Sequence, residues 1–118
     1  MTDGFMKRFA VHRLWVWDRS EVCGLSLVEV DEVSHIVSAV RPLACETERT
    51  EWIGGFVIVA PQCTSPLSGE SFDAYRKRLL SEWDSAECRS SHSLYAYHFS
   101  PFNVVDMDFP AVSRMTVL

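Results

Sequence analysis

The chain has 118 residues and a mass of 13.5 kDa, the size of one domain and far short of the roughly 250 residues of a (β/α)₈ barrel. Hydrophobic residues make up 47% and charged residues 23%, which is typical of a globular protein rather than a disordered one. The formal net charge of −5 disfavours nucleic acid and anionic membranes as partners. We therefore expect a single domain over residues 1–118 that binds no nucleic acid and no membrane.

The beginning of the chain does not have the pattern of a secretory signal. Lys7 and Arg8 are followed by a segment that His12 and Arg13 interrupt, so it lacks the continuous apolar stretch of a signal peptide. No apolar run approaches the roughly 20 residues of a membrane span. The sequence therefore predicts a cytoplasmic protein, in which the cysteines are reduced.

The first sixty residues are typical of β-strands. Residues 9–17 are rich in aromatic and β-branched side chains on both faces, which predicts a strand covered on both sides or running between two sheets. Residues 22–31 and 33–40 are separated by a short acidic turn, which predicts an antiparallel hairpin. The apolar run at 56–60 is too short for a helix and predicts a buried strand.

A helix is predicted over residues 71–84, where the apolar period changes from two to about 3.6. Ser71 is a suitable N-cap because its hydroxyl can accept from a free backbone amide. Further strands are expected at 93–99 and 111–118, with a loop or short edge strand at 101–108. The residues expected on the buried face of the helix are Phe72, Tyr75, Leu79, Leu80 and Trp83.

These elements predict a mainly β fold of the α+β class. We expect an antiparallel β-sandwich or a partly open barrel of five to seven strands, with one amphipathic helix packed on a face or closing an end.

Part of the chain resembles a known family. Residues 23–61 contain a glycine before a strand, an acidic turn, an Ile-Val pair in the next strand, and a glycine-led apolar strand that ends in proline. The matching residues are Gly24 and the segments 28–31, 36–40 and 54–61. This pattern resembles the small N-terminal β-sandwich domain of metal-dependent amidohydrolases, and it implies a sandwich-like fold.

The chain departs from that family where the catalytic barrel would begin. In the family a His-x-His metal pair closely follows the proline, whereas Gln62 and Cys63 follow Pro61 here and no histidine occurs before His92. The resemblance therefore implies no hydrolase activity. The C-terminal half looks like short uncharacterised bacterial proteins.

Four residues could carry metal or thiol chemistry. Cys88 and His92 have the spacing of half a zinc site, but no second pair is evident and a solvated loop is the simpler interpretation. Cys63 follows a buried strand and could be a nucleophile with His98 as its base, although a lone loop cysteine is more often incidental. We expect no catalytic residue, no metal and no cofactor.

The aromatic residues are the most informative feature for function. Aromatic side chains on two strands can form a ligand cleft or a partner surface, and the alternative is core packing. The four tryptophans exceed what a core of this size needs, so we expect some to be buried in a dimer. A third hypothesis is a small-molecule ligand bound in a cleft near Glu46 and Trp52. The candidate ligand or interface residues are Trp15, Trp17, Glu46, Trp52, Tyr95 and Tyr97.

The sequence thus favours a non-enzymatic binding or assembly module that acts as a homo-oligomer or on a protein partner. The alternative is a small Cys/His-based hydrolase or metal-binding protein.

Overall fold

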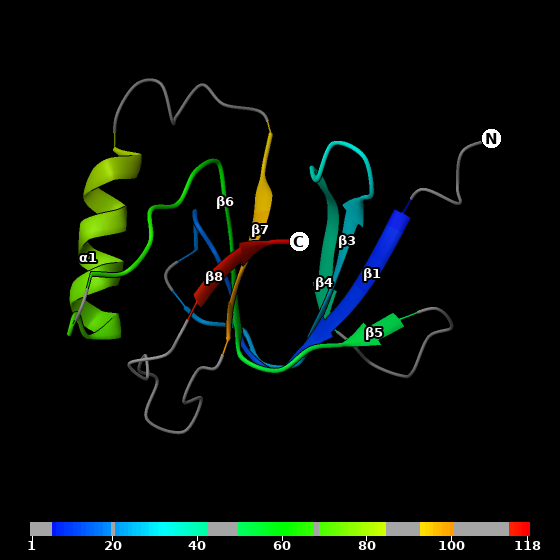
Figure 1. The fold of residues 1–118 in the computed structure, drawn as a ribbon, viewed down its shortest axis with the longest axis horizontal. Coiled ribbons are helices and arrows are strands. Elements are labelled where there is room, and N and C mark those ends of the chain that lie inside the picture. Colours follow the sequence, from blue (N-terminus) through cyan, green and yellow to red (C-terminus); the bar gives the residue numbers. More distant parts are fainter. Residues whose placement is uncertain (1–5, 20, 43–49, 68, 85–92, 101–113) are drawn as a thin grey trace.

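Three layers make up the described part of the chain, which comprises residues 6–19, 21–42, 50–67, 69–84, 93–100 and 114–118 of a computed structural model (Figure 1). Two layers are β-sheets and the third is a helix. The elements are β1 (Met6–Val11), β2 (Leu14–Val16), β3 (Ser26–Asp31), β4 (Val37–Pro42), β5 (Thr50–Trp52), β6 (Phe56–Ala60), α1 (Phe72–Trp83), β7 (Tyr95–Ser100) and β8 (Arg114–Val117).

The two sheets have four strands each. Sheet A has the order β4-β3-β1-β5 and sheet B the order β2-β6-β7-β8. Figure 1 shows sheet A on the right, sheet B in the middle, and α1 on the left against the outer face of sheet B. The predicted mainly β, sandwich-like fold with one helix is confirmed. Both sheets are mixed rather than antiparallel, because β1 pairs with β5 and β2 with β6 in parallel.

The segment predicted as one strand over 9–17 is two strands in different sheets. β1 ends at Val11 in sheet A and β2 begins at Leu14 in sheet B, so the chain crosses between the sheets. The β5–β6 segment crosses between the sheets beside it and in parallel with it. The sequence did not predict β5, because this strand lies in a charged stretch that looks irregular.

The second crossing contains one residue more than the first. Ala10 pairs with Trp52 and Leu14 with Val57. The three residues between β1 and β2 therefore lie opposite four residues of the β5–β6 segment. Gly55 absorbs the extra residue with a φ of +84°, a conformation that other residues rarely adopt. A Cβ at this position would overlap the carbonyl oxygen of Phe99.

The predicted antiparallel hairpin is confirmed as β3 and β4. It begins later on both strands than the sequence indicates. The carboxylate of Asp31 accepts hydrogen bonds from the amides of Val33 and Ser34, so these residues form the turn instead of the next strand. Cys23 lies before β3, where it is half-buried and forms an isolated antiparallel β-bridge with Leu14 through its backbone.

Two hydrophobic clusters lie on the two faces of β6, which is buried along its whole length. The cluster between sheet B and α1, called here the aromatic layer, comprises Trp15, Phe56, Ile58, Ala60, Phe72, Tyr75, Leu79, Trp83 and Phe99. The cluster between the two sheets, called the aliphatic layer, comprises Phe9, Val11, Leu14, Val16, Val28, Val30, Val57, Val59 and Ala96.

The predicted helix is confirmed as α1, with Ser71 as its N-cap and its hydroxyl oxygen 3.1 Å from the amide nitrogen of Ala74. One expected core residue is wrongly placed. Leu80 is 45% exposed, because at 100° per residue it lies at the edge of the stripe that Leu79 and Trp83 bury. The predicted strand at 93–99 corresponds to β7, which begins two residues later and extends to Ser100, and the predicted strand at 111–118 contains β8. The loop or short edge strand predicted at 101–108 lies outside the described residues.

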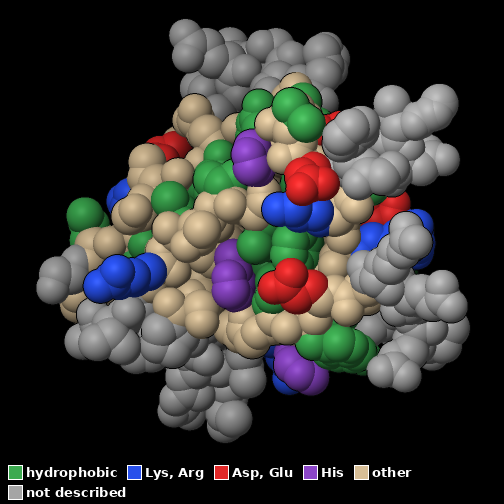
Figure 2. All heavy atoms as spheres, turned by 45° about the vertical axis from the view of Figure 1, so that its right-hand side comes forward, with side chains coloured by type: hydrophobic (Ala, Val, Ile, Leu, Met, Phe, Trp, Pro, Cys, Tyr) green, Lys and Arg blue, Asp and Glu red, His purple; other side chains and the backbone are tan. Residues whose placement is uncertain are grey.

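The described helix is too short and too polar to cross a bilayer. On the side of the molecule nearest sheet A, Figure 2 shows positive and negative side chains interspersed with hydrophobic ones. In sheet A, Glu29 of β3 lies between Arg8 of β1 and Arg41 of β4, with nitrogen–oxygen distances of 3.4 Å and 2.9 Å.

Candidate functional site

The turn after β2 presents Trp17 beside α1. Its geometry is fixed by the amide of Arg19, which donates to the carbonyl of Val16 at 2.9 Å. The indole Nε1 of Trp15 donates to the carbonyl of Arg19 at 2.8 Å, which ties the turn to the aromatic layer. The amide of Trp17 donates to Val59 at 2.9 Å, so three hydrogen bonds hold this segment in place.

An open groove of about 480 Å³ lies between this turn and α1. Its apolar part comes from Trp17 and Leu80, and the indole of Trp17 packs edge-on against Trp83 with ring centroids 6.3 Å apart. Because both walls belong to hydrogen-bonded elements, the groove exists before anything binds. The lining residues are Trp17, Asp18, Arg19, Asp73, Arg76, Lys77 and Leu80.

The rim of the groove carries three cations and two carboxylates, in contrast to the acidic chain as a whole. Lys77 pairs with Asp73 at 3.3 Å, but both side chains are more than three-quarters exposed, so this pair is weak. The guanidinium of Arg76 lies 4.8 Å above the ring of Trp15. The apolar lining residues Trp17 and Leu80 are called here the floor of the groove, and the charged lining residues, which are basic on balance, its rim.

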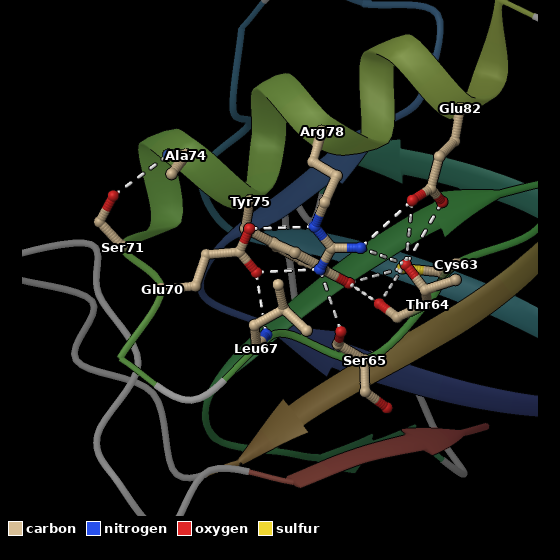
Figure 3. Close-up of polar contacts among 10 residues, drawn as sticks. All are labelled: Cys63, Thr64, Ser65, Leu67, Glu70, Ser71, Ala74, Tyr75, Arg78 and Glu82. Carbon is tan, nitrogen blue, oxygen red and sulfur yellow. Dashed lines mark hydrogen bonds and ion pairs between the residues drawn. The ribbon is translucent and has the colours of Figure 1, made fainter.

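A second polar cluster lies on another side of α1 (Figure 3). Arg78 binds Glu70 through two parallel contacts, Nε to Oε2 at 3.0 Å and Nη2 to Oε1 at 2.9 Å. It also donates to Glu82, to the hydroxyl of Thr64 and to the carbonyl of Ser65. These contacts attach the loop before α1 to the helix. The hydrogen bond from Arg78 lowers the pKa of Glu70, so the carboxylate stays ionised.

Cys63 lies at the edge of this cluster and of the aromatic layer. Its sulfur is 2.9 Å from the hydroxyl of Tyr75, which donates to the carbonyl of Thr64. Burial raises the pKa of the Cys63 thiol to about 11, and burial with the neighbouring Cys63 raises that of Tyr75. A thiol with this pKa is protonated at neutral pH, which gives no support to a role as a nucleophile.

Cys63 and His98 are not brought together. Tyr97 and Cys63 pack against the aromatic layer, whereas His98 pairs with Val57 and so lies on the opposite face of sheet B. The ring Nε2 of His98 is hydrogen-bonded with the carbonyl of Gly54, beside the chain crossing. The structure therefore places this histidine in a structural contact rather than beside a thiol.

The candidate aromatic residues divide between core and surface. Trp15 is fully buried, and Tyr95 and Tyr97 are half-buried on β7. Burial raises the pKa of Tyr97 to about 12. Trp52 is 48% exposed and its ring lies 6.1 Å from that of His12. Only Trp17 among these candidates lines the groove.

The remaining candidates, Glu46, Cys88 and His92, lie outside the described residues. Within the described ranges, no three His, Cys, Asp or Glu side chains are grouped as a metal site would require. Comparisons of the chain with protein-family models, with curated proteins and with solved structures found no match. The resemblance to the amidohydrolase sandwich therefore stays a prediction.

The sequence analysis missed the charged side of the groove and the network around Arg78. The available signal was helical spacing: Asp73, Lys77 and Leu80 follow one another at intervals of four and three residues. Their proximity to Trp17 depends on the pairing of β2 with β6 and on the packing of α1, which no local pattern contains.

Proposed function

We propose that the chain is a non-enzymatic binding and assembly module that acts by self-association or on a protein partner, through the groove between α1 and the turn after β2. The observation that carries this proposal is an apolar floor left at the surface. Leu80 is 45% exposed and Trp17 is half-buried, although the neighbouring Leu79 and Trp83 are buried. Apolar side chains that border a charged rim are typical of protein interfaces.

The rigidity of the groove supports a binding role. The hydrogen bonds of Trp15, Trp17 and Arg19 fix one wall, and the N-cap and the Arg78 network fix the helix that forms the other. Little conformational entropy is therefore lost when a partner binds. Tryptophan and arginine are also the residues that most often dominate binding energy at interfaces.

The test compares two substitutions of exposed leucines. Leu80→Asp places a carboxylate on the floor of the groove, and Leu67→Asp does the same on a loop leucine that is 63% exposed and does not line the groove. Neither leucine is in the core, so both variants should fold, which circular dichroism checks. Sedimentation velocity and native mass spectrometry then measure association.

We expect the wild-type protein to form a complex of at least twice 13.5 kDa at high micromolar concentration. Leu80→Asp should remove this association and Leu67→Asp should retain it. A monodisperse wild-type monomer with no recovered partner would contradict the proposal, as would equal association of both variants.

A further inference from the structure

The hairpin turn at residues 31–34 is an exposed acidic and apolar segment. Val33 is 75% exposed, more than any of the other large hydrophobic residues exposed in the described structure. Glu32 beside it is exposed and makes no ion pair within the described residues. An aliphatic side chain next to a carboxylate is complementary to an apolar floor with a basic rim.

The hairpin turn is also rigid. The Asp31 carboxylate holds the amides of Val33 and Ser34 at 2.8 Å and 2.9 Å, and the amide of His35 donates to the Asp31 carbonyl at 2.9 Å. The backbone hydrogen bonds from Ser34 and Val33 lower the pKa of Asp31 and keep it ionised. Val33 and Glu32 are therefore presented in a fixed arrangement, which reduces the entropy lost on docking.

The groove has a matching feature on its rim. Arg19 is exposed and makes no ion pair in the described part of the chain, and it adjoins the floor formed by Trp17 and Leu80. An incoming carboxylate would find a guanidinium there that no described carboxylate occupies. Arginine is well suited to this contact because its planar donors bind carboxylates with defined geometry.

The hairpin turn and the groove cannot meet within one molecule. Figure 1 shows α1 on the left and the β3–β4 hairpin on the right, with sheet B between them. A contact between them therefore requires a second copy.

We infer that the groove binds the hairpin turn of a second copy of this chain, with Val33 on the floor between Trp17 and Leu80 and Glu32 paired with Arg19. This inference rests on the proposed function, of which it names the partner. Each copy has one hairpin turn and one groove. Two copies can therefore form a closed dimer in which each turn occupies the groove of the other copy, or successive copies can form a longer assembly.

A charge-exchange experiment tests the pairing. Glu32→Lys and Arg19→Glu each place like charges opposite one another, and the double variant restores an opposite pair. Glu51→Lys, on β5 outside both surfaces, is the matched control for net charge. Val33→Ser removes the apolar anchor. Sedimentation velocity at equal concentrations gives the apparent Kd of each protein.

We expect Glu32→Lys, Arg19→Glu and Val33→Ser each to weaken association at least tenfold. The double variant should recover most of that loss, and Glu51→Lys should associate like the wild type. Recovery of association in the double variant identifies Glu32 and Arg19 as the pair. If each substitution only disturbed the structure, the losses of affinity would add in the double variant.

The outcomes separate this inference from the proposed function. If Leu80→Asp abolishes association while Glu32→Lys and Val33→Ser leave it unchanged, another segment occupies the groove and the inference is overturned alone. If the wild-type protein is a monomer that binds another protein through the groove, the inference is again overturned alone. If it is a monomer with no recovered partner, both are overturned.

Discussion

The two faces of sheet B are packed with different kinds of side chain. Six of the nine buried residues in the aromatic layer are aromatic, whereas in the aliphatic layer only Phe9 is. β6 belongs to both, with Phe56 and Ile58 toward α1 and Val57 toward sheet A. β-Branched residues suit the second face, because two pleated sheets pack at about 10 Å and leave little depth for large rings.

The aromatic layer does more than fill space, because its rings carry polar tips. Trp15 donates to the carbonyl of Arg19, Trp83 to that of Gln62, and Tyr75 to that of Thr64. Each bond fixes a loop that leads into or out of sheet B, including the turn that holds Trp17. The buried tryptophans Trp15 and Trp83 therefore have a structural role: they hold loops in place, and one of those loops forms the groove.

The largest loss of stability is expected from a substitution where the β5–β6 segment crosses from sheet A to sheet B. Gly55→Ala would force a side chain onto the carbonyl oxygen of Phe99 at a φ of +84°, and would displace β6 from β7. Both layers would lose packing, so we expect the free energy of unfolding to fall by about 4 kcal/mol, the upper range for single substitutions. Urea denaturation measures this.

Gly54→Ala is the control for that experiment. A Cβ added at Gly54 would meet no heavy atom within 4 Å, and the residue has no positive φ, so its substitution should change stability by less than about 1 kcal/mol. Equal effects at Gly54 and Gly55 would show that the positive φ of Gly55 and its close approach to Phe99 do not determine the loss of stability.

Substitutions in the aromatic layer should disturb the loops that its side chains hold, whereas substitutions in the aliphatic layer should not. Trp15→Phe removes the indole donor to Arg19 and leaves a cavity, at a cost of about 3 kcal/mol. Val57→Ala in the aliphatic layer should cost about 2 kcal/mol. Only Trp15→Phe should speed hydrogen exchange at the Arg19 amide beyond the loss of global stability, and with it weaken association. A similar local change in Val57→Ala would show that the aromatic layer has no special role in holding the Arg19 turn.

Cys63, at the edge of the aromatic layer, should react slowly with alkylating reagents. Because burial raises the pKa of Cys63 from 9.0 to about 11, its thiolate fraction near neutral pH is about a hundredfold below that of the unfolded chain. Iodoacetamide should modify Cys63 at least that much more slowly in the folded protein than in urea. The rate should rise with pH up to about 11. Fast modification near pH 7 would instead favour the hydrolase alternative.

The same pKa predicts how stability changes in base. The folded state holds the Cys63 proton more tightly than the unfolded state, so stability falls as the pH rises from 9.0 toward 11. Cys63→Ser should show a smaller fall over this range. Part of the fall should remain, because burial also raises the pKa values of Tyr75 and Tyr97 above 10.0.

The sequence predicted those parts of the fold that local patterns determine. The helix with its Ser71 cap, the buried strand at 56–60 and the hairpin each follow from periodicity or turn chemistry within about ten residues. The parallel pairing of β1 with β5 and β2 with β6 was missed, because it joins segments about forty residues apart. Trp17 was identified as a candidate, but Arg19 in the same turn was not. Lys77 and Leu80 were missed because only the packing of α1 brings them to Trp17.

The two ion pairs of α1 should contribute to stability according to their burial. Glu70 is 10% exposed and held by two contacts from Arg78, so Glu70→Gln should lower stability at neutral pH by about 1–2 kcal/mol. Lys77→Gln is the control: it breaks an exposed pair in the groove and should cost at most about 0.5 kcal/mol.

The Glu70 effect should disappear in acid. The pKa of Glu70 is lowered from 4.5 in the folded state, so its stabilisation is complete above 4.5 and is lost as the pH falls through the folded value. The difference in unfolding free energy between the wild type and Glu70→Gln should therefore narrow below pH 4.5, as followed by urea denaturation at a series of pH values. A difference that stays constant into strong acid would mean that the loop before α1 is held by packing on Tyr75 and Trp83 rather than by the charge of Glu70.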